Sequence, residues 1–239
     1  MNRLNMMVCP HDTAKLPERW FRFAQHLSHH LSNVVHFEPS LDFAEFDAKV
    51  GQADLVYANP QHALRLTSER GFIPVARASN LYDEAVLVTC AECEAGEIDF
   101  HQAEVATVEP MLVTRVACVA LGRKGIVPAT LQSCSSWMGV VHALYRERAR
   151  LGILYKDFYE DMSELSRSTV RMIGETSERS VYHCFMLAPR HAALAEGLRQ
   201  AMLGMADEAD GADILARLHM ERLVAVAPAD LEVIRSLRG

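Results

Sequence analysis

The sequence of 239 residues is 50% hydrophobic, and its mean hydropathy is +0.01. These values are typical of a globular chain with ample core, in one large domain or two smaller ones. A net charge of −7 and a pI near 5.9 argue against nucleic acid as the main partner, because phosphate backbones are bound by basic surfaces. An acidic chain can still bind a small anion, since local N–H groups decide that binding.

The N-terminal stretch MNRLNMMVCPHD has one arginine and only a short apolar run, so it does not resemble a signal peptide. No apolar run approaches the length of about 18 residues that could span a membrane. We therefore expect no membrane insertion. We expect a cytoplasmic protein from the sequence as it stands, and a periplasmic one if a leader has been removed. The 6 cysteines fit reduced thiols.

Predicted strands and helices alternate through the first part of the chain, which indicates βαβ units and a mainly parallel sheet. We expect strands at residues 4–9, 34–37, 54–58, 72–76 and 85–89. The pattern predicts a loop at 10–13 and helices at 16–31, 43–50 and from Pro60 to the closing Gly71.

The stretch ADLVYANPQHALRL ends a predicted buried strand abruptly. Asn59 suits an N-cap and Pro60 the first helical position, and ligands of open α/β sheets bind where strands end and helices begin. We therefore expect Tyr57, Asn59 and Gln61 to contact a ligand, the alternative being an ordinary N-cap beside a core tyrosine. Pro10, His11 and Asp12 follow the first strand and are expected on the same rim, unless they lie in a surface loop.

A second α/β region follows the polar stretch CAECEAGEIDFHQ. We expect strands at 104–108, 130–133, 153–155, 170–173 and 181–187, and helices at 111–124 and 137–150. After Pro189 the pattern is helical throughout, at 191–206, 209–219 and 228–237. These last helices need a sheet to pack on, and the first region supplies one. We therefore expect one lobe from residues 1–88 with 186–239, and a second lobe from residues 89–185.

Three stretches resemble the phosphate/phosphite/phosphonate-binding proteins of ABC transporters. DLVYANPQHAL is similar to their strand–Pro–helix motif, GFIPVARASNLYDEAVLV to the next segment, and the C-terminal run from CFMLAPRH to DLEVIRSL to their last segment. The resemblance implies a type II periplasmic-binding-protein fold, with two α/β lobes joined by two crossover strands and a cleft between them. It also implies a small ligand that can be anionic, contact between Tyr82 and that ligand near the hinge, and an ABC permease or a signalling protein as partner.

The second lobe departs from the family pattern in VEPMLVTRVACVALGRKGI. Residues 111–113 are apolar where the family has hydroxyls, and only Thr114 remains as a hydroxyl donor. The next anchor, a Ser–His pair in the family, is CSSWMGVVHAL here, with Ser135 and Ser136 kept and Trp137 in the histidine's place. Trp137 either stacks on a flat ligand group or packs inside the lobe. A tetrahedral oxyanion prefers several short donors, so we expect phosphonate to bind weakly.

No cofactor and no metal are expected. Cys90 and Cys93 form a single CxxC with His101 beyond it, which is weak evidence for zinc without a second pair. Three histidines at the end of the first long helix are expected on a solvated face rather than at a metal (His26, His29 and His30).

Two functions remain open from the sequence. The first is a solute-binding protein that closes on a small ligand for transport or sensing. The second is a cytoplasmic enzyme on the same fold, as in the futalosine route to menaquinone or in thiamine-pyrimidine synthesis. The sequence contains no GxSxG, HExxH, nucleotide-binding glycine loop or Rossmann fingerprint, so no catalytic residue is predicted and the binding protein is favoured.

Overall fold

The structure is a computed structural model that describes residues 3–13, 17–40, 42–92, 99–109 and 111–237. Its contacts divide the chain into two compact units. Unit 1 comprises Met1–Leu81 and Tyr182–Arg235, and unit 2 comprises Tyr82–Val181 and Ser236–Gly239. Where the chain leaves and re-enters unit 1, the N–H of Asp83 donates to the carbonyl of Val181 at 2.8 Å.

Unit 1 contains a mixed sheet in the order β11-β4-β10-β3-β1-β2. The strands β1 and β2 and the strands β1 and β3 pair in parallel, whereas β10 runs antiparallel to both β3 and β4, and β11 antiparallel to β4. The strand bounds are β1 (Arg3–Val8), β2 (Val34–Glu38), β3 (Leu55–Ala58), β4 (Ile73–Ala78), β10 (Cys184–Leu187) and β11 (Leu223–Ala225).

The strand β10 lies between β3 and β4 although it comes more than a hundred residues later in the chain. Both neighbours therefore pair with a strand that follows residues 82–181 of unit 2 in the chain. All four residues of β10 are buried, as the unbroken apolar run CFML requires for a strand covered on both faces.

Helices cover the two faces of this sheet. The helix α9 packs on β4 and β11, α2 packs on β2 and α9, and α10 packs on α2, while α4 packs on β3, β4 and β10. Of the C-terminal helices, α9 thus packs directly on the first sheet, and α10 lies against α2. The helix bounds in unit 1 are α1 (Pro10–Thr13), α2 (Pro17–His30), α3 (Phe43–Lys49), α4 (Pro60–Arg70), α9 (Ala195–Gly204), α10 (Ala209–Arg217) and α11 (Asp230–Ser236).

Unit 2 has a second mixed sheet, in the order β7-β6-β8-β5-β9. One apolar cluster lies between this sheet and α5, and another between the sheet, α6 and α7. The bounds are β5 (Ala85–Cys90), β6 (Glu104–Thr107), α5 (Leu112–Arg123), β7 (Thr130–Ser133), α6 (Trp137–Tyr145), β8 (Leu151–Tyr155), α7 (Lys156–Asp161), α8 (Glu164–Arg167) and β9 (Val170–Glu175).

Several predictions of individual elements are wrong. The expected loop at 10–13 is the helical turn α1, and the expectation of a mainly parallel sheet fails because β5, β10 and β11 pair antiparallel. The helix expected at 137–150 ends at Tyr145, since Glu147 takes a positive φ of 54° that stops the helix. The short helices α7 and α8 were not predicted.

The C-terminal part is not helical throughout. A three-residue strand, β11, interrupts it, and the helix expected at 191–206 begins as a 3-10 segment, Pro189–Leu194, with His191 outside helical geometry. Three residues are too few to show the alternation of apolar and polar side chains that predicts a strand. The strand β11 forms because these residues pair with the free edge of β4.

Asp54 fastens the returning segment to the sheet of unit 1. Its carboxylate accepts from the N–H of Asn5 at 2.7 Å, from Nε of Arg190 at 2.9 Å and lies 2.6 Å from Nε2 of His191. Burial opposes the ionisation of Asp54, but these hydrogen bonds outweigh it and lower the pKa of the carboxyl. One buried side chain therefore joins β1, β3 and the residues that follow β10.

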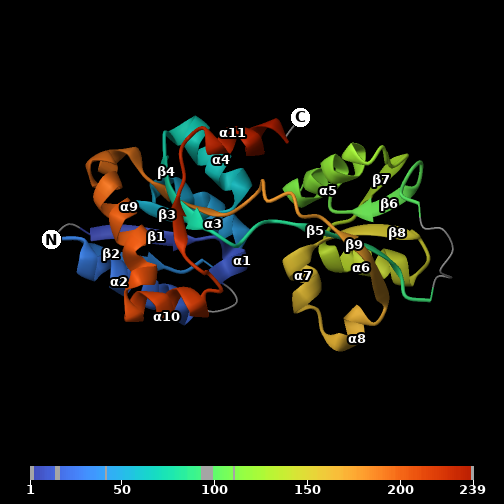
Figure 1. The fold of residues 1–239 in the computed structure, drawn as a ribbon, viewed down its shortest axis with the longest axis horizontal. Helices are drawn as coiled ribbons and strands as arrows, with labels where there is room; N and C mark the ends of the chain where they lie inside the picture. The colour runs from blue at the N-terminus through green and yellow to red at the C-terminus, as the bar shows by residue number, and fades with distance from the viewer. Residues whose placement is uncertain (1–2, 14–16, 41, 93–98, 110, 238–239) are drawn as a thin grey trace. The chain divides into compact units, whose positions relative to one another are not determined.

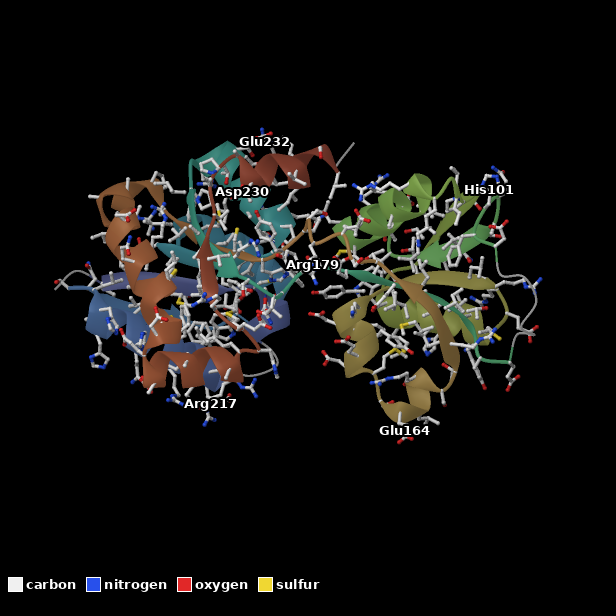
Figure 2. The ribbon with its side chains drawn as sticks, in the orientation of Figure 1. His101, Glu164, Arg179, Arg217, Asp230 and Glu232 are labelled. Atoms are coloured by element: carbon white, nitrogen blue, oxygen red, sulfur yellow. The ribbon has the colours of Figure 1, made fainter. Side chains whose placement is uncertain are left out.

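Asp54→Asn is expected to lower the free energy of unfolding by about 2 kcal/mol or more, because a buried charged acceptor with three partners is lost. Denaturant unfolding of the variant measures this loss. The matched control is Glu232→Gln, which removes an exposed carboxylate paired with Arg235 (Figure 2) and is expected to change little. Equal stability of the two variants would contradict the role given to Asp54.

Candidate functional site

The carboxyl ends of β1 and β3 and the beginning of β10 lie at the same edge of the unit 1 sheet, because β10 runs antiparallel to β3. The N–H of Cys9 donates to the carbonyl of Tyr57 at 2.9 Å and joins the two strand ends. We call the side chains of Cys9, Asp12, Asn59 and His183 at this place the unit 1 edge.

Asn59 is the N-cap of α4, as the sequence predicts. Its φ of −64° and ψ of 163° are extended, its Oδ1 accepts from the N–H of His62 at 2.9 Å, and Pro60 follows as the first helical residue. Its amide also lies 3.7 Å from Sγ of Cys9. The cap uses the N–H of His62, and Gln61 lies half-buried in the same first turn.

Tyr57 belongs to the core of unit 1. It is 1% exposed, and its ring lies 5.0 Å from that of Trp20 and 4.7 Å from that of Phe185. The ring of His183 lies 5.6 Å away. The ring of Tyr57 therefore packs near a residue of the unit 1 edge, and a contact between its hydroxyl and a ligand stays a prediction.

His183 is a functional candidate that sequence reasoning missed, and it lies beside Asp12, which the sequence places on the same rim as His11. Nδ1 of His183 lies 3.0 Å from Oδ2 of Asp12, and Nε1 of Trp20 donates to the carbonyl of Asp12 at 3.3 Å. The signal for His183 was its place directly before the apolar run CFML. It could be used only once the direction of β10 was known, since that direction brings the start of the strand to this edge.

His62 adds a buried imidazole to the first turn of α4. Its Nε2 lies 2.8 Å from Oδ1 of Asp47, and its buried Nδ1 has no hydrogen-bond partner. Burial lowers the pKa of His62 below its ordinary value of 6.5, and Asp47 offsets only part of that effect. The lowered pKa favours the neutral ring, whose Nε2–H donates to the Asp47 carboxylate and whose Nδ1 is left as the acceptor.

Two further predicted ligand residues, His11 and Tyr82, lie in different units. His11 lies in the helical turn α1, directly after β1, and only its backbone is described. Tyr82 is half-buried and begins unit 2, next to Asp83.

Unit 2 presents two helix N-termini side by side. The strands β6 and β7 are parallel neighbours, and the N–H of Cys134 donates to the carbonyl of Thr107 at 2.7 Å where they end. The helix α5 follows β6 and α6 follows β7. Both helices therefore begin at one edge of the sheet, where their unpaired N–H groups favour an anion.

The start of α5 is apolar, as its sequence indicates. Met111 is its N-cap without a side-chain hydrogen bond, and Leu112 and Val113 are buried. Thr114 is 0% exposed; its hydroxyl donates to the carbonyl of Val108 at 2.9 Å and lies 2.7 Å from Oγ1 of Thr107. Thr114 therefore shapes the turn before α5.

The start of α6 is polar. Ser136 is its N-cap and accepts from the N–H of Gly139 at 3.1 Å, and both Ser136 and Ser135 are exposed. Trp137 is half-buried, with its ring 6.5 Å from that of Tyr155 and with contacts to both apolar clusters of unit 2. A cavity of about 350 Å³ lies between β7 and α6, lined by Ser133, Ser135, His142, Arg146 and Arg148, among others. The two arginines give it a positive potential.

Two groups among the described residues could hold a metal ion. In each, the candidate ligand atoms lie within 4.8 Å of one another: Cys9, Asp12 and His183 at the unit 1 edge, and His26, His30 and Glu208 elsewhere in unit 1. Cys93 of the single CxxC lies outside the described residues, whereas Cys90 is buried at the end of β5.

Comparison with known proteins defines the class. The chain is similar in structure to PhnD1 from Prochlorococcus marinus in complex with methylphosphonate, with a TM-score of 0.72, 15% identity and coverage of 99% and 97% of the two chains. It is also similar to XAC2383 from Xanthomonas citri bound to a chloride ion, with a TM-score of 0.67, 15% identity and coverage of 98% of this chain and 95% of that one. A third similar structure is a putative periplasmic sulfonate-binding protein from Methylobacillus flagellatus, with a TM-score of 0.67, 11% identity and coverage of 99% of this chain and 77% of that one. The chain thus has the two-lobed α/β fold of periplasmic binding proteins.

The family described as "ABC transporter, phosphonate, periplasmic substrate-binding protein" matches residues 6–231. The chain belongs to this family. No curated protein matches it. Among the helices that the structure describes, none is long and apolar enough to cross a membrane. The alternative of an enzyme on the same fold gains no support from these comparisons.

Asn59→Ala is expected to cost about 1 kcal/mol of stability, because the N–H of His62 loses its acceptor. The melting temperature and denaturant unfolding report this cost. Asp42→Ala is the matched control, since Asp42 caps α3 in the same unit by accepting from the N–H of Glu45 at 2.8 Å. Similar losses are expected from both, and no loss from Asn59→Ala would show that the cap contributes nothing.

The free energy of unfolding is expected to fall as the pH drops below about 6.5. The unfolded chain binds a proton at His62 more readily than the folded chain does, because the folded pKa is lowered. Stability is therefore full above the unfolded pKa and is lost as the pH falls through the folded one. Denaturant titrations from pH 8 to about 4.5 measure the slope. His62→Gln should flatten it, whereas His36→Gln, in the exposed part of β2, should not.

Proposed function

We propose that this chain is the substrate-binding component of an ABC importer and that its ligand is a small anion of the phosphonate class. Membership of the family over residues 6–231 carries the proposal. The adjacent N-termini of α5 and α6 support it, because helix N-termini favour negative charge. The bound methylphosphonate in PhnD1 supports the same ligand class.

In unit 2, we infer that backbone N–H groups carry most of the anion contact. The start of α5 offers no hydroxyl that points outward, since Thr114 is buried and bonded within the turn. Ser135 and Ser136 at the start of α6 supply the exposed hydroxyls. Met111 and Trp137, both half-buried, supply apolar surface for an organic substituent on the anion. Thr114 acts indirectly, by fixing the carbonyl of Val108.

In unit 1, we infer that the first turn of α4 and the unit 1 edge meet the ligand. Asn59 and Gln61 present the polar start of α4, and His11 follows β1 beside them in the sheet order. Asp12, whose side chain is 31% exposed, suits a hydrogen-bond donor on the ligand rather than the anion itself. Tyr82 is assigned a ligand contact by the family resemblance.

The partner that follows from this role is an ABC permease, and the location that follows is the periplasm. A signalling partner is the second possibility for a protein that binds a solute and reports it. Co-purification with the permease encoded nearby would separate transport from sensing.

Inorganic phosphate and methylphosphonate are expected to bind with dissociation constants no better than about 0.1 mM, or about −5.5 kcal/mol. The reason is the loss of hydroxyl donors at residues 111–113. Longer alkylphosphonates should bind more tightly than methylphosphonate, because Met111 and Trp137 can cover an apolar group. Isothermal titration calorimetry with this series measures the order. Sub-micromolar binding of methylphosphonate would show that backbone N–H groups compensate fully.

A pair of N-cap variants locates the site. Ser136→Ala should weaken alkylphosphonate binding, whereas Ser163→Ala, which removes the cap of α8 in the same unit, should leave affinity as it is. Both remove a serine that accepts from a backbone N–H, so their effects on stability are comparable. Equal affinity in both variants, or no binding of any phosphonate at millimolar concentration, would overturn the proposal.

A further inference from the structure

A second cluster of polar side chains lies away from the unit 1 edge, where α10 packs on α2. In Figure 1 the two helices lie side by side, and Arg217 in Figure 2 marks the last residue of α10. His26 and His30 are one turn apart on α2, with ring centroids 4.5 Å apart, and Glu208 is the residue directly before α10. Oε2 of Glu208 lies 3.1 Å from Nε2 of His30 and 3.9 Å from Nε2 of His26.

These distances suit one small cation. A tetrahedral zinc ion holds nitrogen and oxygen ligands at about 2.1 Å, which places any two of them about 3.4 Å apart. The separations of 3.1 Å (Glu208 to His30) and 3.9 Å (Glu208 to His26) lie on either side of that value. Small rotations of exposed side chains would equalise them, since His30 is 34% and Glu208 48% exposed.

His26 supplies an observation that packing does not explain. Its side chain is 4% exposed, yet its buried Nε2, which faces Glu208, has no hydrogen-bond partner. A buried polar atom without a partner is costly, and native structures rarely keep one without a reason. An ion that accepts the lone pair of this nitrogen would satisfy it.

The surroundings favour the form of His26 that binds metal. Oδ2 of Asp210 lies 3.7 Å from Nδ1 of His26, so its charge favours a proton on Nδ1 and a free lone pair on Nε2.

The cluster is also held in place. Arg22 on α2 bridges to Asp210 at 3.0 Å and Asp213 at 2.9 Å on α10. Gly211 allows the start of α10 to approach the preceding turn, since a Cβ there would lie 2.2 Å from the carbonyl oxygen of Met205. The position of Glu208 against α2 is therefore set by packing.

We propose that His26, His30 and Glu208 form a binding site for a divalent transition metal of the zinc class, which joins α2 to α10. Two imidazoles and one carboxylate favour zinc, nickel, cobalt or copper over calcium or magnesium. Three protein ligands leave a fourth position for water or for a group from another molecule. The site shares no residue with the unit 1 edge and does not depend on the proposed ligand.

The test uses the full chain without a histidine tag, freed of metal by a chelator. Zinc titrated by calorimetry is expected to bind one ion per chain with a dissociation constant in the low micromolar range or tighter, and to raise the melting temperature. His30→Gln and Glu208→Gln should each weaken zinc binding at least tenfold. Both residues are partly exposed, and Glu208 makes no side-chain cap bond, so the variants should fold. His29→Gln, an exposed histidine on the same helix, is the matched control and should bind as the parent does.

Cobalt distinguishes this site from the cluster of Cys9, Asp12 and His183. A site of two histidines and a carboxylate gives visible d–d absorption without the strong near-ultraviolet band of a thiolate ligand. A thiolate band, unchanged affinity in both His30→Gln and Glu208→Gln, or no zinc binding at micromolar concentration would each overturn the proposal.

Discussion

The insertion of β10 between β3 and β4 is the constraint on which unit 1 depends. A strand buried on both faces must satisfy every N–H and C=O through its two neighbours, and only a returning segment of the chain supplies the missing partner for β3 and β4. Asp54 then holds the residues after that strand, through Arg190 and His191, against β1. Because unit 2 is formed by the residues between β4 and β10, closing this sheet also fixes both points at which the chain leaves unit 1.

The direction of β10 decides that His183 belongs to the unit 1 edge. As it runs antiparallel to β3, its first residues lie where β1 and β3 end. His183 thereby lies at the same edge as Asp12 and Asn59, which come from two other parts of the chain. The aromatic rings of Tyr57, Trp20 and Phe185 pack next to this edge. The ring of Tyr57 contacts both His183 and the aromatic core, so core packing and the geometry of the unit 1 edge are coupled at Tyr57.

In unit 2, neighbouring segments of the chain form a comparable edge. The parallel strands β6 and β7 end at the same edge of the sheet, and α5 and α6 begin there. Exposed hydroxyls are present at the start of α6, whereas the hydroxyl of Thr114 in α5 is buried. The N–H groups at both helix starts belong to the backbone, so they remain whatever side chains stand at residues 111–113.

By itself, the sequence determined the family and those local elements whose start and end residues carry their own capping signals. The capped start of α4 follows from Asn59 and Pro60 alone, and Gly71 ends that helix with a φ of 68°, because these effects act within one turn of the chain. The resemblance in three stretches was sufficient for the two-lobed fold.

Only the tertiary structure decided which residues meet. The apolar run CFML predicts a buried strand but not its direction, so His183 could not be placed beside Asp12 from the sequence. Likewise, the spacing of His26 and His30 puts both on one side of α2, but Glu208 reaches them only because α10 packs there, 178 residues beyond His30. Helix caps involve residues within one turn of each other, so the sequence alone predicts them. The two clusters depend on contacts between distant segments, and these contacts are set by tertiary packing.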